Sequence, residues 1–304
     1  MSYMKILILG ARGSLGQQLV KIFKNDNQII AWDKGEIDIT DKKLILKKAK
    51  DVRPDIIINA AAYNATDKCE ANDSEFELAK KINCEAVGYL AEAALETGAT
   101  IIHYSTDYVF DGEKKRGYKE DDKPNPISRY GESKSAGEKA IISLSGKGLK
   151  WYLIRTSKLF GPKGESADSK ENFFDLISRP LAESSVVEIS DGKKKEFNMV
   201  HGEEISCFTY TPDLARATKE LVESDKGYGI YHIINSGPAS WYEGAKFLFE
   251  LRGITDVKLN PIGSADYPRP AKRPKYSVLL NTKLPPLRDW KEALREYLDL
   301  RFKN

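Results

Sequence analysis

The chain has 304 residues, which is long enough to bury a full core and to form one large domain or two smaller ones. Hydrophobic residues make up 41% of the chain and charged residues 31%, a balance typical of a folded globular protein and not of a disordered one. The 48 basic and 45 acidic side chains leave a net charge of +3, which is too small to indicate a nucleic-acid partner.

The first 155 residues alternate apolar, strand-like runs with amphipathic helix patterns. Strands are expected at 5–10, 28–33, 55–60, 100–105 and 150–156, and helices near 15–24, 41–50, 75–97 and 129–144. Near-continuous apolar strands are typical of a parallel sheet that is covered on both faces. Their alternation with helices predicts an α/β fold with a doubly wound, parallel Rossmann sheet.

This alternation is lost after Arg155, where 161–210 is polar and irregular apart from one helix near 172–182. Regular elements are expected again at 212–224, 229–234, 241–251 and, as a final helix, 289–302. We therefore expect an NAD(P)-binding domain and a smaller, partly interleaved α/β substrate domain. The predicted boundaries are 1–160 plus about 210–237 for the first domain, and 161–209 with 238–304 for the second.

A glycine-rich turn, Gly10-Ala11-Arg12-Gly13-Ser14-Leu15-Gly16, follows the first strand and opens the first helix. Its spacing is GxxGxxG, one residue longer than the GxGxxG of ordinary dehydrogenases. Glycines permit a tight turn and a close backbone approach, so that a pyrophosphate can rest on the N–H groups of the helix N-terminus. The turn predicts a dinucleotide cofactor.

The end of the second strand bears on the choice between NADH and NADPH. Asp33 can bond the ribose hydroxyls of the adenosine, which favours NADH. Arg12 and Lys34 can instead receive a 2′-phosphate, which favours NADPH. Both cofactors remain open on the sequence.

A hydroxyl, a phenol and an ammonium are expected at the reacting end of the cofactor. Thr106 follows the fourth strand, and ligands of open α/β sheets bind beyond the carboxyl ends of the strands. Tyr130 and Lys134 stand four residues apart on the next helix and share one of its faces. We expect Thr106 to hydrogen-bond a substrate carbonyl and Tyr130 to donate a proton. Lys134 would lower the phenol's pKa from about 10 and hold the nicotinamide ribose.

These motifs resemble the dTDP-4-dehydrorhamnose reductase family, which is part of the extended short-chain dehydrogenase/reductases. The resemblance covers most of the chain in the family's order, through "GARGSLG", "VRPDIIINAAAYNATDKCE", "INCEAVGYLAEAA", "STDYVFDG", "NPISRYGESKSAGE", "LIRTSKLFG", "YTPDLA", "GIYHIINSGPASWYE" and "RPKYSVLLNTKL". It implies NAD(P)H-dependent reduction of the 4-keto group of a nucleotide-linked deoxysugar, in making L-rhamnose or a related surface sugar.

The resemblance also implies a set of site residues. The catalytic residues would be Thr106, Tyr130 and Lys134. The cofactor-binding residues would be Gly10, Arg12, Gly13, Ser14, Leu15, Gly16, Asp33, Asp38, Ile39, Ala60, Ala61, Ala62, Ser105, Tyr130 and Lys134. The substrate-binding residues would be Asn64, Thr66, Tyr108, Lys158 and Arg273.

Departures from the family's usual pattern gather on the substrate side. Lys158 stands where the family usually has tryptophan, the segment 191–208 is longer than usual, and Asn64 and Thr66 replace threonine and valine. These departures are either drift at tolerant loops or a sign of a different sugar. The second interpretation predicts that Lys158 and Arg273 contact an anionic part of a substrate other than dTDP-4-dehydrorhamnose.

Two other functions stay open. Some relatives bind NADP without catalysis and regulate a partner enzyme, but such a subunit does not need the phenol–ammonium pair that is present here. Sister dehydratases carry Asp-Glu after the threonine, whereas Tyr108 follows Asp107 in this chain, which disfavours elimination or epimerisation. The nucleotide sugar is the expected partner, and a homodimer is left open.

No metal or membrane association is predicted. The three cysteines and three histidines have no disulfide or metal-ligand spacing. No apolar run approaches the roughly 20 residues that span a bilayer, and the N-terminal apolar run is too short for a signal peptide. We therefore expect a cytoplasmic protein.

Overall fold

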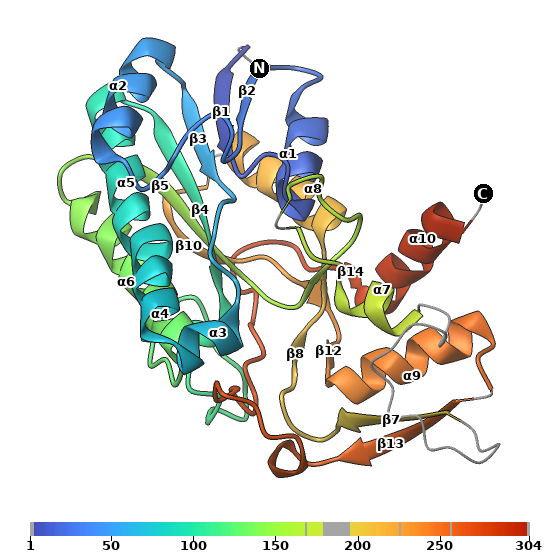
Figure 1. Cartoon of the computed structure of the whole chain (residues 1–304). Helices are drawn as coiled ribbons and strands as arrows, with labels where there is room; N and C mark the ends of the chain where they lie inside the picture. Colours follow the sequence, from blue (N-terminus) through green and yellow to red (C-terminus); the bar gives the residue numbers. More distant parts are fainter. Residues whose placement is uncertain (1–2, 168, 179–194, 225, 256, 303–304) are drawn as a thin grey trace.

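The computed structural model describes residues 3–167, 169–178, 195–224, 226–255 and 257–302. A six-stranded, all-parallel sheet forms the centre of its larger part (Figure 1). In spatial order the strands are β2 (Gln28–Trp32), β1 (Lys5–Leu9), β3 (Ile56–Asn59), β4 (Thr100–Thr106), β5 (Lys150–Thr156) and β10 (Gly229–His232). The predicted doubly wound α/β fold is confirmed.

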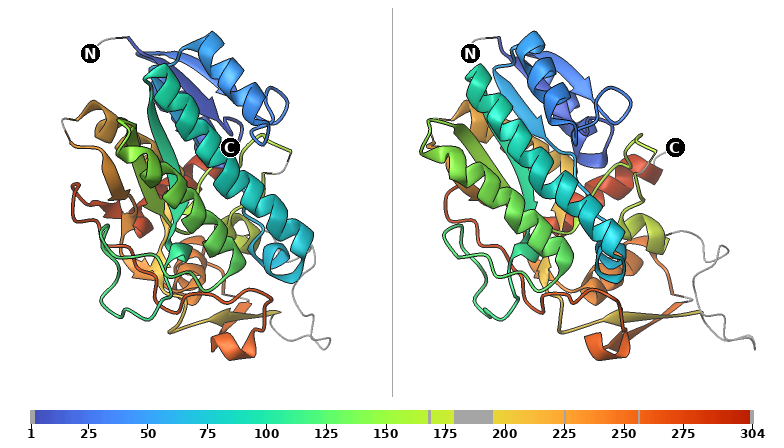
Figure 2. Two further views of the ribbon diagram at one scale, coloured as in Figure 1. Left: turned by 90° about the vertical axis from the view of Figure 1, so that its left-hand side faces the viewer. Right: turned by 60° about the vertical axis from the view of Figure 1, so that its left-hand side comes forward.

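Helices cover both faces of this sheet (Figure 2). On one face lie α1 (Ser14–Phe23) and α8 (Thr211–Glu223), and on the other lie α2 (Lys42–Val52), α5 (Ala86–Thr97) and α6 (Arg129–Ser145). The strand side chains alternate between the two resulting cores, which explains why the strands read as apolar without interruption.

The helix predicted at 75–97 is divided. It consists of α4 (Asp73–Lys80), a π-helical turn at Lys81–Glu85 and α5. Within the turn, the buried Asn83 side chain bonds the N–H and the carbonyl of Tyr63 and the hydroxyl of Ser133. Such π turns are often found where a side chain makes contacts of this kind. The hydrophobic periodicity of the sequence does not predict one.

The smaller part has an aromatic core formed by Phe160, Phe174, Phe208 and Trp290. Around it lie α7 (Phe173–Ser178), α9 (Trp241–Arg252), α10 (Trp290–Phe302) and a parallel pair, β7 (Lys195–Val200) with β13 (Val257–Ile262). The predicted helix 172–182 continues beyond residue 178, so its last residues lie outside the described ranges. Residues 191–194, at the start of the predicted long segment 191–208, also lie outside them. Strand β7 was expected to be irregular.

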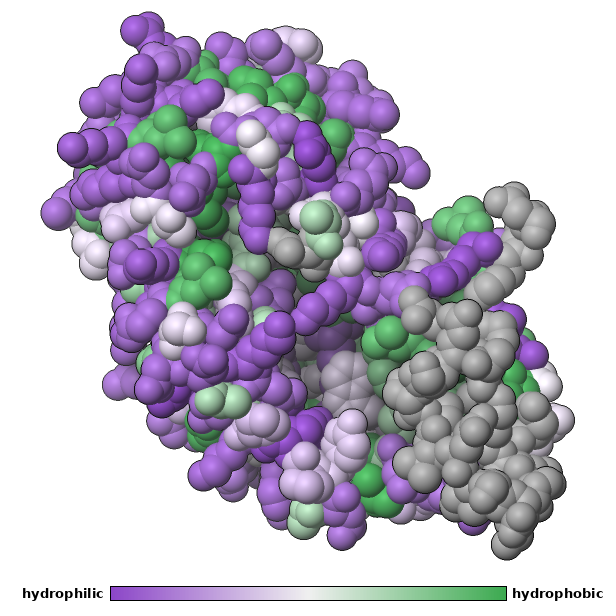
Figure 3. Space-filling model, in the orientation of Figure 1, coloured by the Kyte–Doolittle hydropathy of each residue, from purple (hydrophilic) through white to green (hydrophobic). Residues whose placement is uncertain are grey.

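The remaining elements are short. They are α3 (Thr66–Ala71), two 3-10 turns (Asp107–Val109 and Ser264–Asp266), and the paired strands β6 (Leu159–Phe160) with β9 (Thr209–Tyr210), β8 (Ser206–Cys207) with β12 (Pro238–Ala239), and β11 (Asn235–Ser236) with β14 (Leu287–Asp289). Figure 3 shows a mostly hydrophilic face that is hollowed between the two parts. Among the described residues, no helix has the length and apolarity needed to cross a membrane.

Candidate active site

The glycine turn packs directly on the turn that follows β3. Gly10 has φ of 72°, and a Cβ at this position would lie 2.7 Å from the Ala61 nitrogen. The Ala61 N–H donates to Asn59 Oδ1 at 3.1 Å, which shapes the bend through Ala60 and Ala62. Only glycine fits such an approach at positive φ. The predicted cofactor residues that follow β1 and β3 therefore lie side by side.

This position is the topological switch point of the sheet, because β1 has β2 on one side and β3 on the other. Helix α1 begins at Ser14 with no side-chain hydrogen bond at its Gly13 N-cap, so its first N–H groups are suited to an anion. The residues present therefore fit the pyrophosphate of a dinucleotide. The loop after β6 also packs here, since Ser14 Oγ donates to the Pro162 carbonyl at 2.8 Å.

Asp33 is oriented by the glycine turn. Its carboxylate accepts the N–H of Arg12 at 3.0 Å and that of Lys34 at 2.8 Å. The Arg12 guanidinium is paired with Glu36, a residue that sequence analysis missed and that also accepts the Asp33 N–H. The Asp33 carboxylate, at the end of β2, is suited to ribose hydroxyls. Glu36 pairs with Arg12, which is one of the two cations proposed to bind a 2′-phosphate.

Asp38 and Ile39 lie in the turn between β2 and α2. Asp38 accepts the hydroxyl and the N–H of Thr40 at 2.7 and 2.8 Å, and these bonds hold the pKa of Asp38 below its ordinary value. Ile39 packs against the core beneath α2. The contacts of both residues are within the protein, and their role in cofactor binding stays a prediction.

Thr106 ends β4 at the carboxyl edge of the sheet. Its Oγ1 accepts the Tyr108 N–H at 3.2 Å and donates to Asp107 Oδ1 at 3.2 Å. The Tyr130 phenol lies near enough for the Thr106 side chain to lower the pKa of the phenol. The predicted hydroxyl and phenol are therefore brought together, although they come from different elements.

Helix α6 lies unusually close to the turn after β4. Its Ser128 cap accepts the Gly131 N–H at 3.2 Å, and a Cβ on Gly131 would lie 2.2 Å from the Tyr108 carbonyl oxygen. This close approach sets the Tyr130 ring edge-on to Tyr108, with 5.6 Å between their centroids. Asn64 Oδ1 lies 3.5 Å from the Tyr130 hydroxyl. Three predicted site residues thus meet at one point.

Lys134 is buried beside β4. Its ammonium donates to the Tyr104 carbonyl at 2.6 Å, and its Nζ lies 3.4 Å from His103 Nε2. Burial lowers the pKa of Lys134 to about 8, and the charge of Glu138 opposes this shift. Burial and the nearby ammonium lower the pKa of His103 well below its ordinary value, so this imidazole is neutral.

The expectation that Lys134 lowers the phenol's pKa is wrong in this structure. Burial raises the pKa of Tyr130 because a phenolate would lose its hydration, and the Thr106 hydrogen bond only partly offsets this. The i,i+4 spacing puts both side chains on one helix face, but the longer lysine reaches β4 instead of the phenol.

Ser105 and Asp107 flank Thr106 with their side chains turned into the protein. Ser105 Oγ donates to Glu138 at 2.6 Å, so its hydroxyl does not face the predicted cofactor groove. Asp107 accepts the Ser277 hydroxyl at 2.6 Å, and burial raises the pKa of Asp107 to about 6. Sequence analysis missed Glu138 and Ser277, because only tertiary contacts bring them to β4.

The ammonium of Lys158 lies inside the protein, against carbonyl groups. Its Nζ donates to the Glu204 and Ala239 carbonyls, each at 2.8 Å, and lies 4.5 Å from the centre of the Trp241 ring. Two of three ammonium donors are thus used within the protein, and burial lowers the pKa of Lys158 to about 8. Its backbone is left-handed with φ of 40°. Carbonyl groups hold this buried cation in the structure, and its contact with an anionic substrate stays a prediction.

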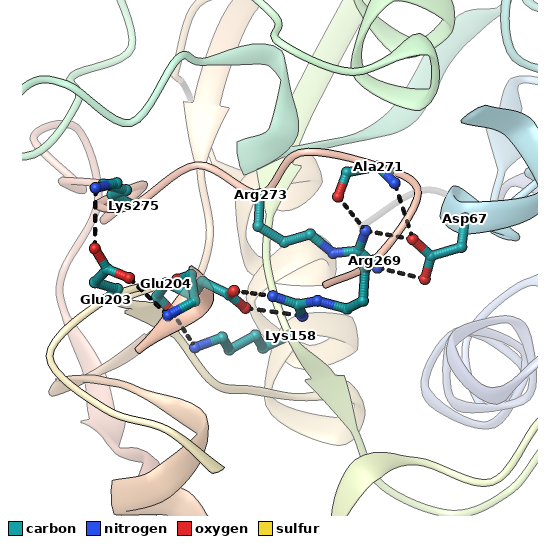
Figure 4. A network of polar contacts seen from close by, with 9 residues as sticks. Asp67, Lys158, Glu203, Glu204, Arg269, Ala271, Arg273 and Lys275 are labelled. Atoms are coloured by element: carbon teal, nitrogen blue, oxygen red, sulfur yellow. Dashed lines mark hydrogen bonds and ion pairs between the residues drawn. The ribbon is translucent and has the colours of Figure 1, made fainter. Parts of the chain in front are cut away.

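Arg273 and Thr66 lie near α3. Arg273 forms a forked ion pair with Asp67 (Figure 4). The N–H of Thr66 donates to the Asn64 carbonyl at 3.0 Å, and α3 begins at Thr66, shortly after the residue that faces Tyr130.

Among the described residues, no cluster of histidine, cysteine or carboxylate side chains has the arrangement of a metal site.

The protein is an NAD(P)H-dependent oxidoreductase of the extended short-chain type. This class is defined by a parallel Rossmann sheet, a glycine turn at the switch point of the sheet, and a threonine–tyrosine–lysine set beyond β4. Residues 4–302 match the family model described as RmlD substrate binding domain, and the chain belongs to this family.

Individual relatives agree along their whole length. A dTDP-4-dehydrorhamnose reductase from Aggregatibacter actinomycetemcomitans is 36% identical, with 96% of this chain and 97% of the relative covered. A crystal structure of a dTDP-4-dehydrorhamnose reductase from Clostridium acetobutylicum is 39% identical, with a TM-score of 0.84 and coverage of 98% and 99%. A third, from Bacillus anthracis in complex with NADP, is 31% identical, with a TM-score of 0.83 and the same coverage.

Proposed function

We propose that this protein uses NADPH or NADH to reduce the 4-keto group of a nucleotide-linked deoxysugar, in the synthesis of a surface polysaccharide sugar. The single observation that carries the proposal is the close packing of α6 on the turn after β4, which brings Tyr130 to the end of the strand that carries Thr106, with the phenol 3.5 Å from Asn64 Oδ1. The named relatives support the substrate class. Because Lys158 is held inside the protein, it gives no reason to exclude dTDP-4-dehydrorhamnose as the substrate.

The cofactor, when bound, supplies the hydride. Tyr130 holds the proton that the carbonyl oxygen requires, and its raised pKa keeps the phenol protonated at neutral pH. Thr106, at the end of β4, offers a second polar contact for the same oxygen. Lys134 fastens α6 to β4, which keeps Tyr130 in line with Thr106. The site therefore contains a positioned proton donor next to the predicted nicotinamide position.

The test is oxidation of NADPH and NADH against a panel of nucleotide 4-keto-sugars that includes dTDP-4-dehydrorhamnose. Tyr130→Phe removes the proton donor and leaves the glycine turn intact. We expect turnover to fall by about 10²–10⁴ with cofactor affinity nearly unchanged. Tyr228→Phe, at an exposed tyrosine, is the matched control and is expected to leave turnover unchanged. Cofactor binding without turnover of any sugar in the panel would favour the regulatory-subunit alternative.

The division into domains is part of the proposal. Most of the cores on either side of the sheet comes from 1–160 and about 210–237, and most of the aromatic core comes from 161–209 with 238–304, which supports a substrate domain; Phe160 and Tyr210 of the first range join the aromatic core. The cytoplasmic setting and the homodimer remain predictions. Sedimentation of the purified protein at several concentrations tests the homodimer.

A further inference from the structure

The chain segment 267–275, here called the arginine segment, runs between the two parts of the molecule. Two of its arginines each grip a carboxylate (Figure 4). Arg273 pairs with Asp67 of α3, in the larger part, and Arg269 pairs with Glu204, close to β8. The segment therefore joins the two parts by forked ion pairs of the geometry that also recognises phosphate.

Three donors converge on Asp67. Arg273 Nη1 and Nη2 donate to its two oxygens at 2.5 and 2.7 Å, and the Ala271 N–H donates to Oδ1 at 3.2 Å. Arg273 Nη1 also donates to the Ala271 carbonyl at 2.7 Å, which orients the guanidinium independently of Asp67. The result is a preorganised cradle for one oxyanion, and a side-chain carboxylate of this same chain lies in it.

The two ion pairs differ in how easily the carboxylate can leave. The Asp67 side chain is 41% exposed, whereas that of Glu204 is 4% exposed. Glu204 also has left-handed backbone, with φ of 55°, and its carbonyl accepts the Lys158 ammonium. Glu204 is therefore locked in place, while Asp67 has only to turn towards solvent. Asp67 is thus the exposed partner of its pair, while the Arg273 side chain is only 12% exposed.

The cradle lies next to the reaction site. Asp67 directly follows Thr66, whose N–H donates to the Asn64 carbonyl at 3.0 Å, and Asn64 Oδ1 lies 3.5 Å from the Tyr130 hydroxyl. A nucleotide sugar carries its diphosphate directly on the sugar ring. A sugar held at Tyr130 would therefore bring phosphate oxygens close to the arginine segment.

We propose that Asp67 is an internal stand-in for phosphate, and that the substrate's diphosphate displaces it from Arg273 and the Ala271 N–H. Binding of substrate then exchanges one link between the two parts for a bond to the ligand, while the Arg269–Glu204 pair stays closed and holds the segment. This inference rests on the proposed function, from which it takes the diphosphate.

The exchange is tested by calorimetry on protein saturated with NADP⁺, so that the glycine turn is already occupied. The probes are thymidine diphosphate and, without phosphates, thymidine. Asp67→Asn removes the competing charge, and we expect its Kd for thymidine diphosphate to fall about three- to tenfold while thymidine binding stays the same. Asp73→Asn, which breaks a more exposed arginine pair, is the control and is expected to change neither.

An unchanged or higher Kd for thymidine diphosphate in folded Asp67→Asn would overturn the exchange. If that variant does not fold, Arg273→Gln is used in its place. Loss of thymidine diphosphate binding with thymidine binding intact would support the cradle, and an equal loss of both would overturn it. The reductase assay is separate. If the protein reduces a keto-sugar but Asp67→Asn has no effect on diphosphate binding, only the proposed exchange is contradicted. If Asp67→Asn binds diphosphate more tightly but no sugar is reduced, only the proposed reductase activity is contradicted.

Discussion

The ammonium of Lys134 donates a 2.6 Å hydrogen bond to the carbonyl oxygen of Tyr104, two residues before Thr106 in β4. This bond ties the helix that carries Tyr130 to the strand that carries Thr106. The His103 imidazole, whose Nε2 lies 3.4 Å from the Lys134 ammonium, is neutral because its pKa is lowered. Of these two side chains, Lys134 therefore carries the positive charge. Its charge is therefore maintained against burial by the Tyr104 carbonyl and Glu138.

Cofactor binding and turnover should decline as the pH rises through about 8, because Lys134 loses its proton there. Its folded pKa lies below the unfolded value of about 10.4, so the unfolded state binds more protons between these two pH values. The contribution of Lys134 to the free energy of unfolding therefore increases with pH across that window. Chemical unfolding and NAD(P)H titration from pH 7 to 10 measure both effects. A Lys134→Met protein with the same two pH dependences as the unaltered protein would contradict this assignment.

Asp33 should decide the choice between NADH and NADPH. In Asp33→Ala the carboxylate that suits the ribose hydroxyls is lost, and so is its repulsion of a 2′-phosphate. We expect the ratio of kcat/KM values to shift towards NADPH by about tenfold, a change of about 1.4 kcal/mol. Steady-state kinetics with both cofactors measures it. An unchanged ratio would assign the preference to Arg12, Glu36 or Lys34, and Glu36→Gln, which releases Arg12, would separate these possibilities.

Lys158→Met should lower stability more than it alters substrate affinity. The methionine leaves the Glu204 and Ala239 carbonyls without their ammonium partner, which should cost about 1–3 kcal/mol in the free energy of unfolding. Urea unfolding and the substrate KM together measure this split. Lys163→Met, at an exposed lysine, is the control and should leave both quantities unchanged. A large rise in KM with unaltered stability would restore the contact between Lys158 and the substrate.

Asp107→Asn should remove a pH dependence of stability between about pH 4 and 6. Burial raises the pKa of Asp107 to about 6, so the folded state binds more protons than the unfolded state in this range. The contribution of Asp107 to stability is therefore present at low pH and lost as the pH rises through about 6. Relative to the unaltered protein, Asp107→Asn should gain up to about 3 kcal/mol between pH 4 and 7. Parallel unfolding curves across this range would show that Asp107 does not titrate there.

Sequence analysis succeeded where a local pattern has one structural outcome. The five apolar runs of the first 155 residues predicted a covered parallel sheet, and the glycines of Gly10–Gly16 predicted a tight turn after the first strand. It missed β7, which pairs only with the distant β13, and it missed the π turn at Asn83. Both depend on partners that lie far away in the chain.

The residue types in this chain determined the doubly wound fold, the glycine turn and the presence of a hydroxyl, a phenol and an ammonium at its reacting edge. Where those groups point was decided only by the tertiary structure. Lys134 was expected at the phenol and lies on β4, and Lys158 was expected at an anion and lies on two carbonyls. A long cationic side chain reaches many positions from one Cα, and burial sends it to the nearest oxygen acceptors, which distant segments of the chain supply.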